Sequence, residues 1–215
     1  MDLREVNVST LLPITERPIK VFMAVKADYH PIRKKLGCGS LWRKFIQHHR
    51  LQTEGQQQQK AEEMVVLSLT WTSDYLKKVS QSQFCLSPRG VAGWSPRTFD
   101  SILMGCIPVL VADYTAYPFQ RTLDWTKFAV FVREAEIPVI GEILSAISPE
   151  RMTEMHLALK AIGRRTFLYH DHESEMLSRF SLVDLALREF TLQQRVFSYD
   201  EVWHNNNTPR YQAVI

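Results

Sequence analysis

The chain has 215 residues, of which 45% are hydrophobic and 23% are charged, and its formal net charge is +3. This composition is typical of one large globular domain, and the nearly balanced charge argues against a nucleic-acid or membrane-surface partner. The sequence shows no apolar run of transmembrane length, and its first residues lack the pattern of a secretory signal peptide.

Apolar segments alternate along the chain between the periods of strands and helices. Strands are expected over residues 19–25, 64–69, 84–86, 107–112 and 128–132. Helices are expected over residues 31–49, 74–80, 96–104, 138–146, 149–169 and 174–192. This alternation predicts an α/β fold, a Rossmann-like parallel sheet with flanking helices. One apolar stripe on the helix 149–169 indicates core packing rather than cofactor contact: Met152, Met155, Leu159 and Ile162.

The domain is predicted to span residues 17–195, after an N-terminal extension (1–16) and before an irregular C-terminal tail (196–215). A Gln-rich stretch at about 54–62 is interpreted as a surface insertion. The densest basic cluster lies on the predicted helix 31–49, and we interpret it as a solvated helix face rather than a track for anionic glycans. Its members are Arg33, Lys34, Lys35, Arg43 and Lys44.

Three cysteines, Cys38, Cys85 and Cys106, do not suggest a disulfide framework. Cys85 and Cys106 fall in apolar strand segments, where a free thiol behaves as a small hydrophobe. We therefore expect buried free thiols with a structural role, rather than redox or nucleophilic chemistry.

The helix 96–104 has clear end signals. Ser95 is placed to cap it, Pro96 suits its first position, and Gly105 is a usual stop. Arg97 and Asp100, three residues apart, share one face. A helix N-terminus with a guanidinium suits a phosphate or diphosphate, and a nearby acid can accept hydrogen bonds from sugar hydroxyls. From the spacing alone, a solvated ion pair between Arg97 and Asp100 is the commoner arrangement.

Candidate metal ligands are few. The cluster His170-Asp171-His172-Glu173 follows the predicted helix 149–169 and is interpreted as a helix end rather than a metal site, because consecutive side chains point in different directions. There is no Asp-x-Asp triplet that would hold a metal-bound diphosphate. The sequence therefore predicts no metal and no other cofactor.

An ordered series of short segments surrounds the helix 96–104. It consists of Tyr75, Ser82-Gln83-Phe84-Cys85-Leu86-Ser87-Pro88-Arg89-Gly90, Ser95-Pro96-Arg97, Gly105-Cys106-Ile107-Pro108-Val109, Pro118-Phe119, Leu123-Asp124-Trp125, Phe128-Ala129-Val130, Glu136-Ile137-Pro138 and Ile143-Leu144. This series resembles the exostosin family of glycosyltransferases, which includes the exostosins of heparan sulfate synthesis and many plant and algal cell-wall enzymes. The resemblance is dense from residue 75 to residue 144.

The resemblance implies the C-terminal, donor-binding lobe of a two-lobed glycosyltransferase of the GT-B type, usually inverting and using a UDP-sugar. Carried over by position, Arg97 would contact the diphosphate and Asp100 the ribose hydroxyls. Ser95 and the main-chain amides of residues 90–94, beginning at Gly90, would complete a phosphate cradle. Arg89 or Lys26 would add positive charge.

Two departures from the family pattern concern this site. The family usually has Glu at the position of Asp100, so the carboxylate here is one methylene shorter. A turn that commonly ends in Gly-Arg near the first strand is replaced by residues 22–27, which contain no glycine and keep one basic residue, Lys26. Trp94, Tyr114 and Tyr117 could line the donor pocket or serve as ordinary packing residues.

The length of 215 residues would hold one lobe of such an enzyme, so an acceptor-binding lobe is expected to be missing, and no residue is assigned as the catalytic base. The expected partners are a nucleotide-sugar donor, a glycan acceptor and a complementary lobe or subunit. By resemblance the protein would work on the lumenal side of the Golgi membrane. Two alternatives remain: a non-catalytic exostosin-like interaction module or fragment without turnover, and another nucleotide-binding α/β enzyme.

Overall fold

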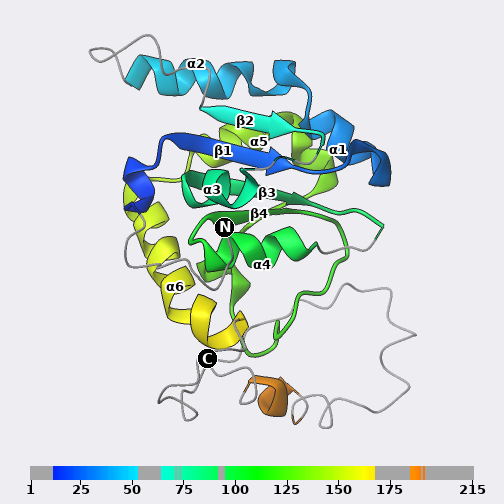
Figure 1. Cartoon of the computed structure of the whole chain (residues 1–215), viewed down its shortest axis with the longest axis vertical. Coiled ribbons are helices and arrows are strands. Elements are labelled where there is room, and N and C mark those ends of the chain that lie inside the picture. Colours follow the sequence, from blue (N-terminus) through cyan, green and yellow to red (C-terminus); the bar gives the residue numbers. More distant parts are fainter. Residues whose placement is uncertain are drawn as a thin grey trace.

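The computed structural model describes residues 12–52, 64–70, 72, 74–91, 95–167, 185–189 and 191. Five strands form one sheet in the order β2-β1-β3-β4-β5, and all neighbouring pairs are parallel. The strands are β1 (Ile19–Ala24), β2 (Val65–Ser68), β3 (Ser82–Pro88), β4 (Ile107–Val111) and β5 (Val130–Val132). This arrangement confirms the predicted Rossmann-like α/β fold (Figure 1).

The α-helices include α1 (Pro31–Leu36), α2 (Arg43–Gln52), α3 (Tyr75–Ser80), α4 (Pro96–Leu103), α5 (Ile140–Ser145) and α6 (Pro149–Phe167). Short 3₁₀ helices cover Ile14–Glu16, Ala27–Tyr29, Gly39–Trp42, Trp125–Lys127 and Glu134–Val139. In Figure 1, α4 lies beside α6, and α2 lies above the β2 end of the sheet. The helices therefore enclose the central strands, as a parallel sheet requires.

Side chains of β1 alternate between the two faces of the sheet. Val21 and Met23 join the large core with α1, α2 and α5, whereas Phe22 and Ala24 join a smaller cluster with α3. β3 and β4 are buried along their whole length. On α6, the predicted stripe is confirmed as core: Met155, Leu159 and Ile162 are buried and Met152 packs against them.

The predicted helix 31–49 is wrong as a single element. The chain forms α1, a 3₁₀ turn and then α2, with the break at Gly37 and Gly39. The indole N–H of Trp42 donates to the carbonyl of Leu36 at 2.9 Å and so satisfies a carbonyl at the end of α1. Gly37 is the C-cap of α1, and its main-chain N–H donates to the carbonyl of Arg33. Glycine is a poor helix former, so Gly37 and Gly39 favour an interruption at this point.

The α-helix predicted over residues 138–146 begins later in the structure than the sequence suggested. Residues Glu134–Val139 form a 3₁₀ helix that includes Pro138, and the α-helix begins only at Ile140. Of the predicted helix 174–192, only residues 185–189 and 191 are described, and these are helical. The Gln-rich insertion, His170-Asp171-His172-Glu173 and the C-terminal tail lie outside the described residues. The predicted domain boundaries stay a prediction.

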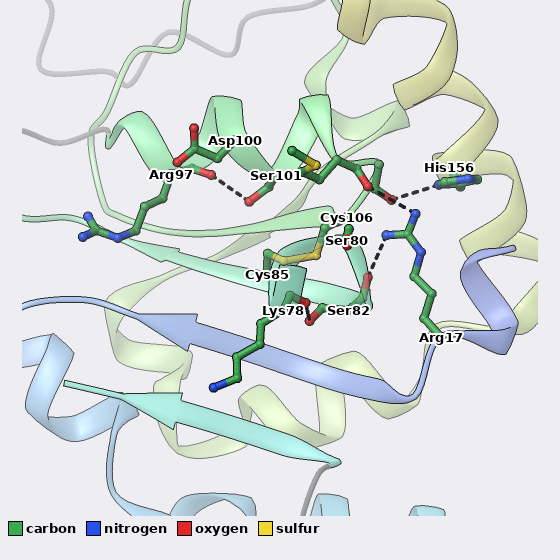
Figure 2. Close-up of a disulfide and its surroundings, with 12 residues drawn as sticks. Arg17, Lys78, Ser80, Ser82, Cys85, Arg97, Asp100, Ser101, Cys106 and His156 are labelled. Carbon is green, nitrogen blue, oxygen red and sulfur yellow. Dashed lines mark hydrogen bonds between the residues drawn. A yellow bond between two sulfur atoms is a disulfide. The ribbon is translucent and has the colours of Figure 1, made fainter. Parts of the chain in front are cut away.

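The cysteine prediction is wrong for two of the three residues. Cys85 of β3 and Cys106, just before β4, form a disulfide between neighbouring strands (Figure 2). Parallel pairing of β3 with β4 brings their Cα atoms to 5.9 Å, within the range that a disulfide needs. Both residues are buried, and Cys38 is an exposed free thiol. Sequence spacing gives no sign of this pairing because it depends on sheet register.

Candidate nucleotide-binding site

A cavity of about 310 Å³ opens at the carboxyl ends of β1 and β2. The strand order reverses between β1 and β3, and in doubly wound sheets ligands bind outside the strand ends at such a switch point. The cavity is lined by three small apolar residues, two tyrosines, two threonines and three charged residues. They are Ala24, Val25, Pro96, Tyr29, Tyr75, Thr70, Thr72, Lys26, Arg97 and Asp100. Three of the six predicted donor-binding residues, Lys26, Arg97 and Asp100, are thus brought together.

Ser95 and Arg97 meet at the start of α4 as the sequence predicts. The Ser95 hydroxyl accepts the Arg97 main-chain N–H at 3.4 Å and Arg97 Nη1 at 3.3 Å. Arg97 Nε donates to the carbonyl of Ala24, the last residue of β1. Among the described residues, Arg97 Nη2 donates no hydrogen bond. The guanidinium is therefore held between β1 and α4 with donor capacity left on the cavity wall.

Asp100 follows Arg97 by three residues, and the two side chains bind other partners instead of forming the ion pair that their spacing favoured. Asp100 Oδ2 accepts the phenol O–H of Tyr75 at 3.0 Å. Burial raises the pKa of the Asp100 carboxyl above its ordinary value, and the Tyr75 hydrogen bond and the Arg97 charge oppose that rise. The cavity thus holds a partly desolvated carboxylate one helical turn from a guanidinium.

The sequence interpretation missed that Arg33 is buried next to the cavity, behind the lining residue Lys26. Arg33 was grouped with a solvated basic face, and Lys34, Lys35, Arg43 and Lys44 are indeed exposed, but Arg33 is only 3% exposed. The signal was the spacing of the buried residues Ile32 and Leu36, which places position 33 at the border of the apolar face of α1.

The Arg33 guanidinium donates to three main-chain carbonyls. Nε reaches Arg89 O at 2.9 Å, Nη1 reaches Lys26 O at 3.1 Å, and Nη2 reaches Pro88 O at 3.5 Å. Burial lowers the pKa of Arg33, and the charge of Arg97 lowers it further. Arg33 therefore joins the segments at the ends of β1 and β3 and adds a buried positive charge to this edge of the sheet.

Gly90 has a packing reason to be glycine. A Cβ built at Gly90 would collide with Arg33 Nη2. The backbone after β3 therefore lies directly against the guanidinium, and the predicted donor-binding role of Gly90 stays a prediction. Residues 92–94, including Trp94 and most of the predicted amide cradle, lie outside the described residues.

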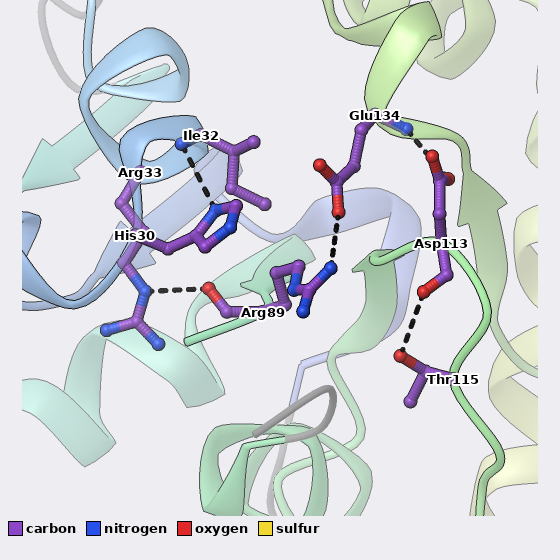
Figure 3. A network of polar contacts seen from close by, with 7 residues as sticks. All are labelled: His30, Ile32, Arg33, Arg89, Asp113, Thr115 and Glu134. Carbon is purple, nitrogen blue, oxygen red and sulfur yellow. Dashed lines mark hydrogen bonds and ion pairs between the residues drawn. The ribbon is translucent and has the colours of Figure 1, made fainter. Parts of the chain in front are cut away.

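Arg89 points to another part of the same edge. Its Nη1 pairs with Glu134 at 3.3 Å, and the Glu134 main-chain N–H donates to Asp113 Oδ1 at 3.0 Å (Figure 3). Arg89 does not line the 310 Å³ cavity, although its carbonyl accepts from Arg33. Its side chain thus joins the end of β3 to the segment after β5, which Asp113 links to the segment after β4, and its predicted role in donor binding stays a prediction.

The remaining predicted aromatics separate into two kinds. Tyr117 is buried and packs on Trp125 with ring centroids 5.0 Å apart, so it is a core residue. Tyr114 is 96% exposed, has a φ of 53° and does not line the cavity. Neither tyrosine lines the pocket. The aromatic residues that do, Tyr29 and Tyr75, carried no assigned role in the sequence.

The described residues contain neither a metal-binding cluster nor a membrane-spanning helix. In that part of the chain, no group of three His, Cys, Asp or Glu side chains could hold a metal ion. Nor does any helix there have the length and apolar character to cross a bilayer.

Comparison with known proteins gives matches over the same region. A family model described as the exostosin GT47 domain matches residues 5–147. "Probable glucuronosyltransferase 47 A" of Physcomitrium patens is 38% identical over 88 residues, covering 41% of this chain and 20% of the relative. "Probable beta-1,4-xylosyltransferase IRX10L" of Arabidopsis thaliana is 38% identical over 84 residues, covering 39% of this chain and 20% of the relative.

A third relative matches over a longer segment. "Probable glucuronoxylan glucuronosyltransferase IRX7" of Arabidopsis thaliana is 31% identical over 143 residues, covering 66% of this chain and 30% of the relative. The matched part of this chain therefore spans 20% to 30% of these three relatives.

Proposed function

We propose, from the premise that this chain belongs to the exostosin GT47 family, that it is the donor-binding part of a glycosyltransferase. The family membership confirms the resemblance found in the sequence. The proposed reaction transfers a sugar from a nucleotide-sugar donor, a UDP-sugar, to a glycan or cell-wall polysaccharide acceptor. Arg97 carries the proposal, because its guanidinium lies at the N-terminus of α4, on the wall of a cavity at the switch point of the sheet.

The charges around the cavity suit a diphosphate. Arg97 and Lys26 line it, and the buried Arg33 lies behind the backbone of Lys26. A leaving nucleoside diphosphate gains negative charge as the glycosidic bond breaks, and fixed positive groups stabilise that charge in the transition state. In the proposal these residues and the α4 amides perform this step without a metal ion.

Asp100 is proposed to accept a hydrogen bond from the ribose. It lies about one helical turn from Arg97 on the cavity wall, and the Tyr75 hydrogen bond keeps the carboxylate in place. Deprotonation of the acceptor hydroxyl needs a general base, and this chain is not assigned one. Acceptor binding and that base are proposed to come from a complementary lobe or subunit.

The proposed location is the Golgi lumen. The Cys85–Cys106 disulfide supports it, because disulfides form and persist in oxidising compartments of the secretory pathway.

Isothermal titration with UDP, UDP-glucuronate and UDP-xylose tests the proposal. The two sugars follow the printed names of the relatives. We expect saturable binding that weakens about tenfold or more in Arg97→Ala, because a charge-assisted phosphate contact is lost. Arg43→Ala, an exposed arginine on α2, is the matched control and should bind as the unmodified chain does. Absence of binding at millimolar UDP would reject the proposal and favour a non-catalytic interaction module.

A further inference from the structure

We infer that Tyr75 is a positioning residue that fixes Asp100 so that the site recognises one ribose hydroxyl rather than two. The inference rests on the proposed function of the cavity as a nucleotide-sugar site. Tyr75 begins α3, and Asp100 lies on α4, so their contact joins two helices across the cavity wall. The phenol O–H donates to Asp100 Oδ2 at 3.0 Å.

Tyr75 is itself held in place by packing. Its ring lies 5.9 Å from the ring of Phe22, centroid to centroid, and it packs against the cluster that contains Val79 and Ala24. The half-buried phenol is therefore supported from β1, while its hydroxyl reaches α4. A support of this kind fixes a rotamer before a ligand arrives and reduces the entropy lost on binding.

The protonation states make the direction of the hydrogen bond definite. Burial raises the pKa of Tyr75, and the neighbouring Asp100 carboxylate raises it further. Tyr75 thus stays a neutral phenol over the physiological range and acts as donor to the carboxylate. Because the bond is charge-assisted, it is among the stronger hydrogen bonds in the cavity wall.

One oxygen of Asp100 remains for a ligand. Among the described residues, Oδ2 accepts from Tyr75 and Oδ1 accepts no hydrogen bond. A free carboxylate can accept from the 2′ and 3′ hydroxyls of a ribose together, one at each oxygen. The Tyr75 hydrogen bond occupies one acceptor site on Oδ2 and fixes the orientation of the carboxylate, so Oδ1 is the oxygen that keeps both of its acceptor sites for a ligand.

Titration of UDP, 2′-deoxy-UDP and 3′-deoxy-UDP into the full chain tests this inference. We expect one deoxy analogue to bind about tenfold more weakly than UDP, because a hydrogen bond to a charged group is lost, and the other to bind within about twofold of UDP. In Tyr75→Phe, which keeps the ring packing, the affinity difference between UDP and that deoxy analogue should fall to about threefold or less, since the carboxylate is no longer held. Asp100→Asn should reduce this difference in the same way.

The ratio of UDP to UMP affinity is the internal control. It reports the contact with the second phosphate and should be the same in Tyr75→Phe as in the unmodified chain. A purely structural role for Tyr75 would weaken every ligand by the same factor and leave the deoxy ratios unchanged.

Two further results have distinct meanings. If the unmodified chain binds UDP but both deoxy analogues lose affinity equally, or Tyr75→Phe keeps the original ratio, the inference about Tyr75 is wrong and the proposed function stands. If the unmodified chain binds no UDP, the proposed function is rejected and this inference with it. Circular dichroism of each variant confirms that the comparison is made between folded proteins.

Discussion

Two buried arginines make the same kind of contact at opposite ends of β3. At the amino end, Arg17 donates to the carbonyls of Leu12, Ser82 and Met104 at 3.3, 2.9 and 3.2 Å. At the carboxyl end, Arg33 donates to the three carbonyls that flank the cavity. Each guanidinium satisfies main-chain acceptors that would otherwise be buried without partners.

The surroundings of the two arginines differ. Arg17 lies against Gly105, whose φ is 63° and whose carbonyl is 2.9 Å from His156 Nδ1, in a closely packed region (Figure 2). Arg33 lies near a second guanidinium, Arg97, beside an open cavity. Positive charges gathered beside a cavity cost stability unless an anion binds there. The same contact therefore lies in close packing at one end of the sheet and beside an open cavity at the other.

Replacing each arginine by methionine should give the largest effects. Arg17→Met and Arg33→Met should each lower the free energy of unfolding by about 3 kcal/mol or more, because buried carbonyls lose their donors. Only Arg33→Met should also lose UDP affinity, since Arg33 holds the backbone of Lys26, which lines the cavity. Urea unfolding and UDP titration at a temperature where both variants are folded measure the two effects. Equal loss of UDP binding in both variants would remove the functional distinction between the two ends.

Removing the disulfide should affect stability without affecting the cavity. The double replacement Cys85→Ala and Cys106→Ala opens a covalent loop with a sequence separation of 21 residues and should lower the free energy of unfolding by roughly 3 kcal/mol. UDP affinity at low temperature should not change, because neither cysteine lines the cavity. Cys38→Ser, at the exposed free thiol, is the control and should alter neither quantity. A tenfold loss of affinity in the double variant would show that the disulfide shapes the donor site.

Acidification should weaken the amino end by a smaller amount. Burial lowers the pKa of His156 to about 4, with further lowering from the charges of Arg17 and Lys160. In the unfolded chain a histidine takes up its proton near its ordinary pKa of about 6.5. Stability from this residue is therefore present above pH 6.5 and is lost as the pH falls towards 4.

His156→Gln should accordingly give a flatter stability profile between these two pH values. Chemical unfolding at a series of pH values measures this slope. His49, whose pKa is also lowered to about 4 by burial and by Lys20, remains in the variant and should keep part of the slope. An unchanged slope in His156→Gln would mean that the imidazole is not buried in its neutral form.

The sequence predicts the carboxyl end of the sheet better than the amino end. Ser95, Pro96 and Gly105 mark the ends of α4 through local backbone chemistry, so the positions of Arg97 and Asp100 on it follow from the sequence. The family resemblance then supplies the expected ligand. Local signals of this kind depend on residues close together in the chain, which is why they can be read directly.

Contacts between distant segments could not be read in this way. The Cys85–Cys106 disulfide depends on the register of β3 with β4, and the role of Arg33 depends on the backbone 55 and 56 residues further along the chain. The Tyr75–Asp100 hydrogen bond joins two helices and has no local sequence pattern. Each of these features is set by tertiary packing.

Hydrogen–deuterium exchange with and without saturating UDP tests most directly whether the carboxyl end is the ligand site. We predict slower exchange in peptides covering residues 24–33, 86–91 and 95–103, which contain the ends of β1 and β3 and the start of α4. Exchange at the amino end, in peptides covering residues 12–18, 104–107 and 152–159, should not change. Protection at the amino end alone, or no protection anywhere, would contradict the assignment of the cavity as a nucleotide site.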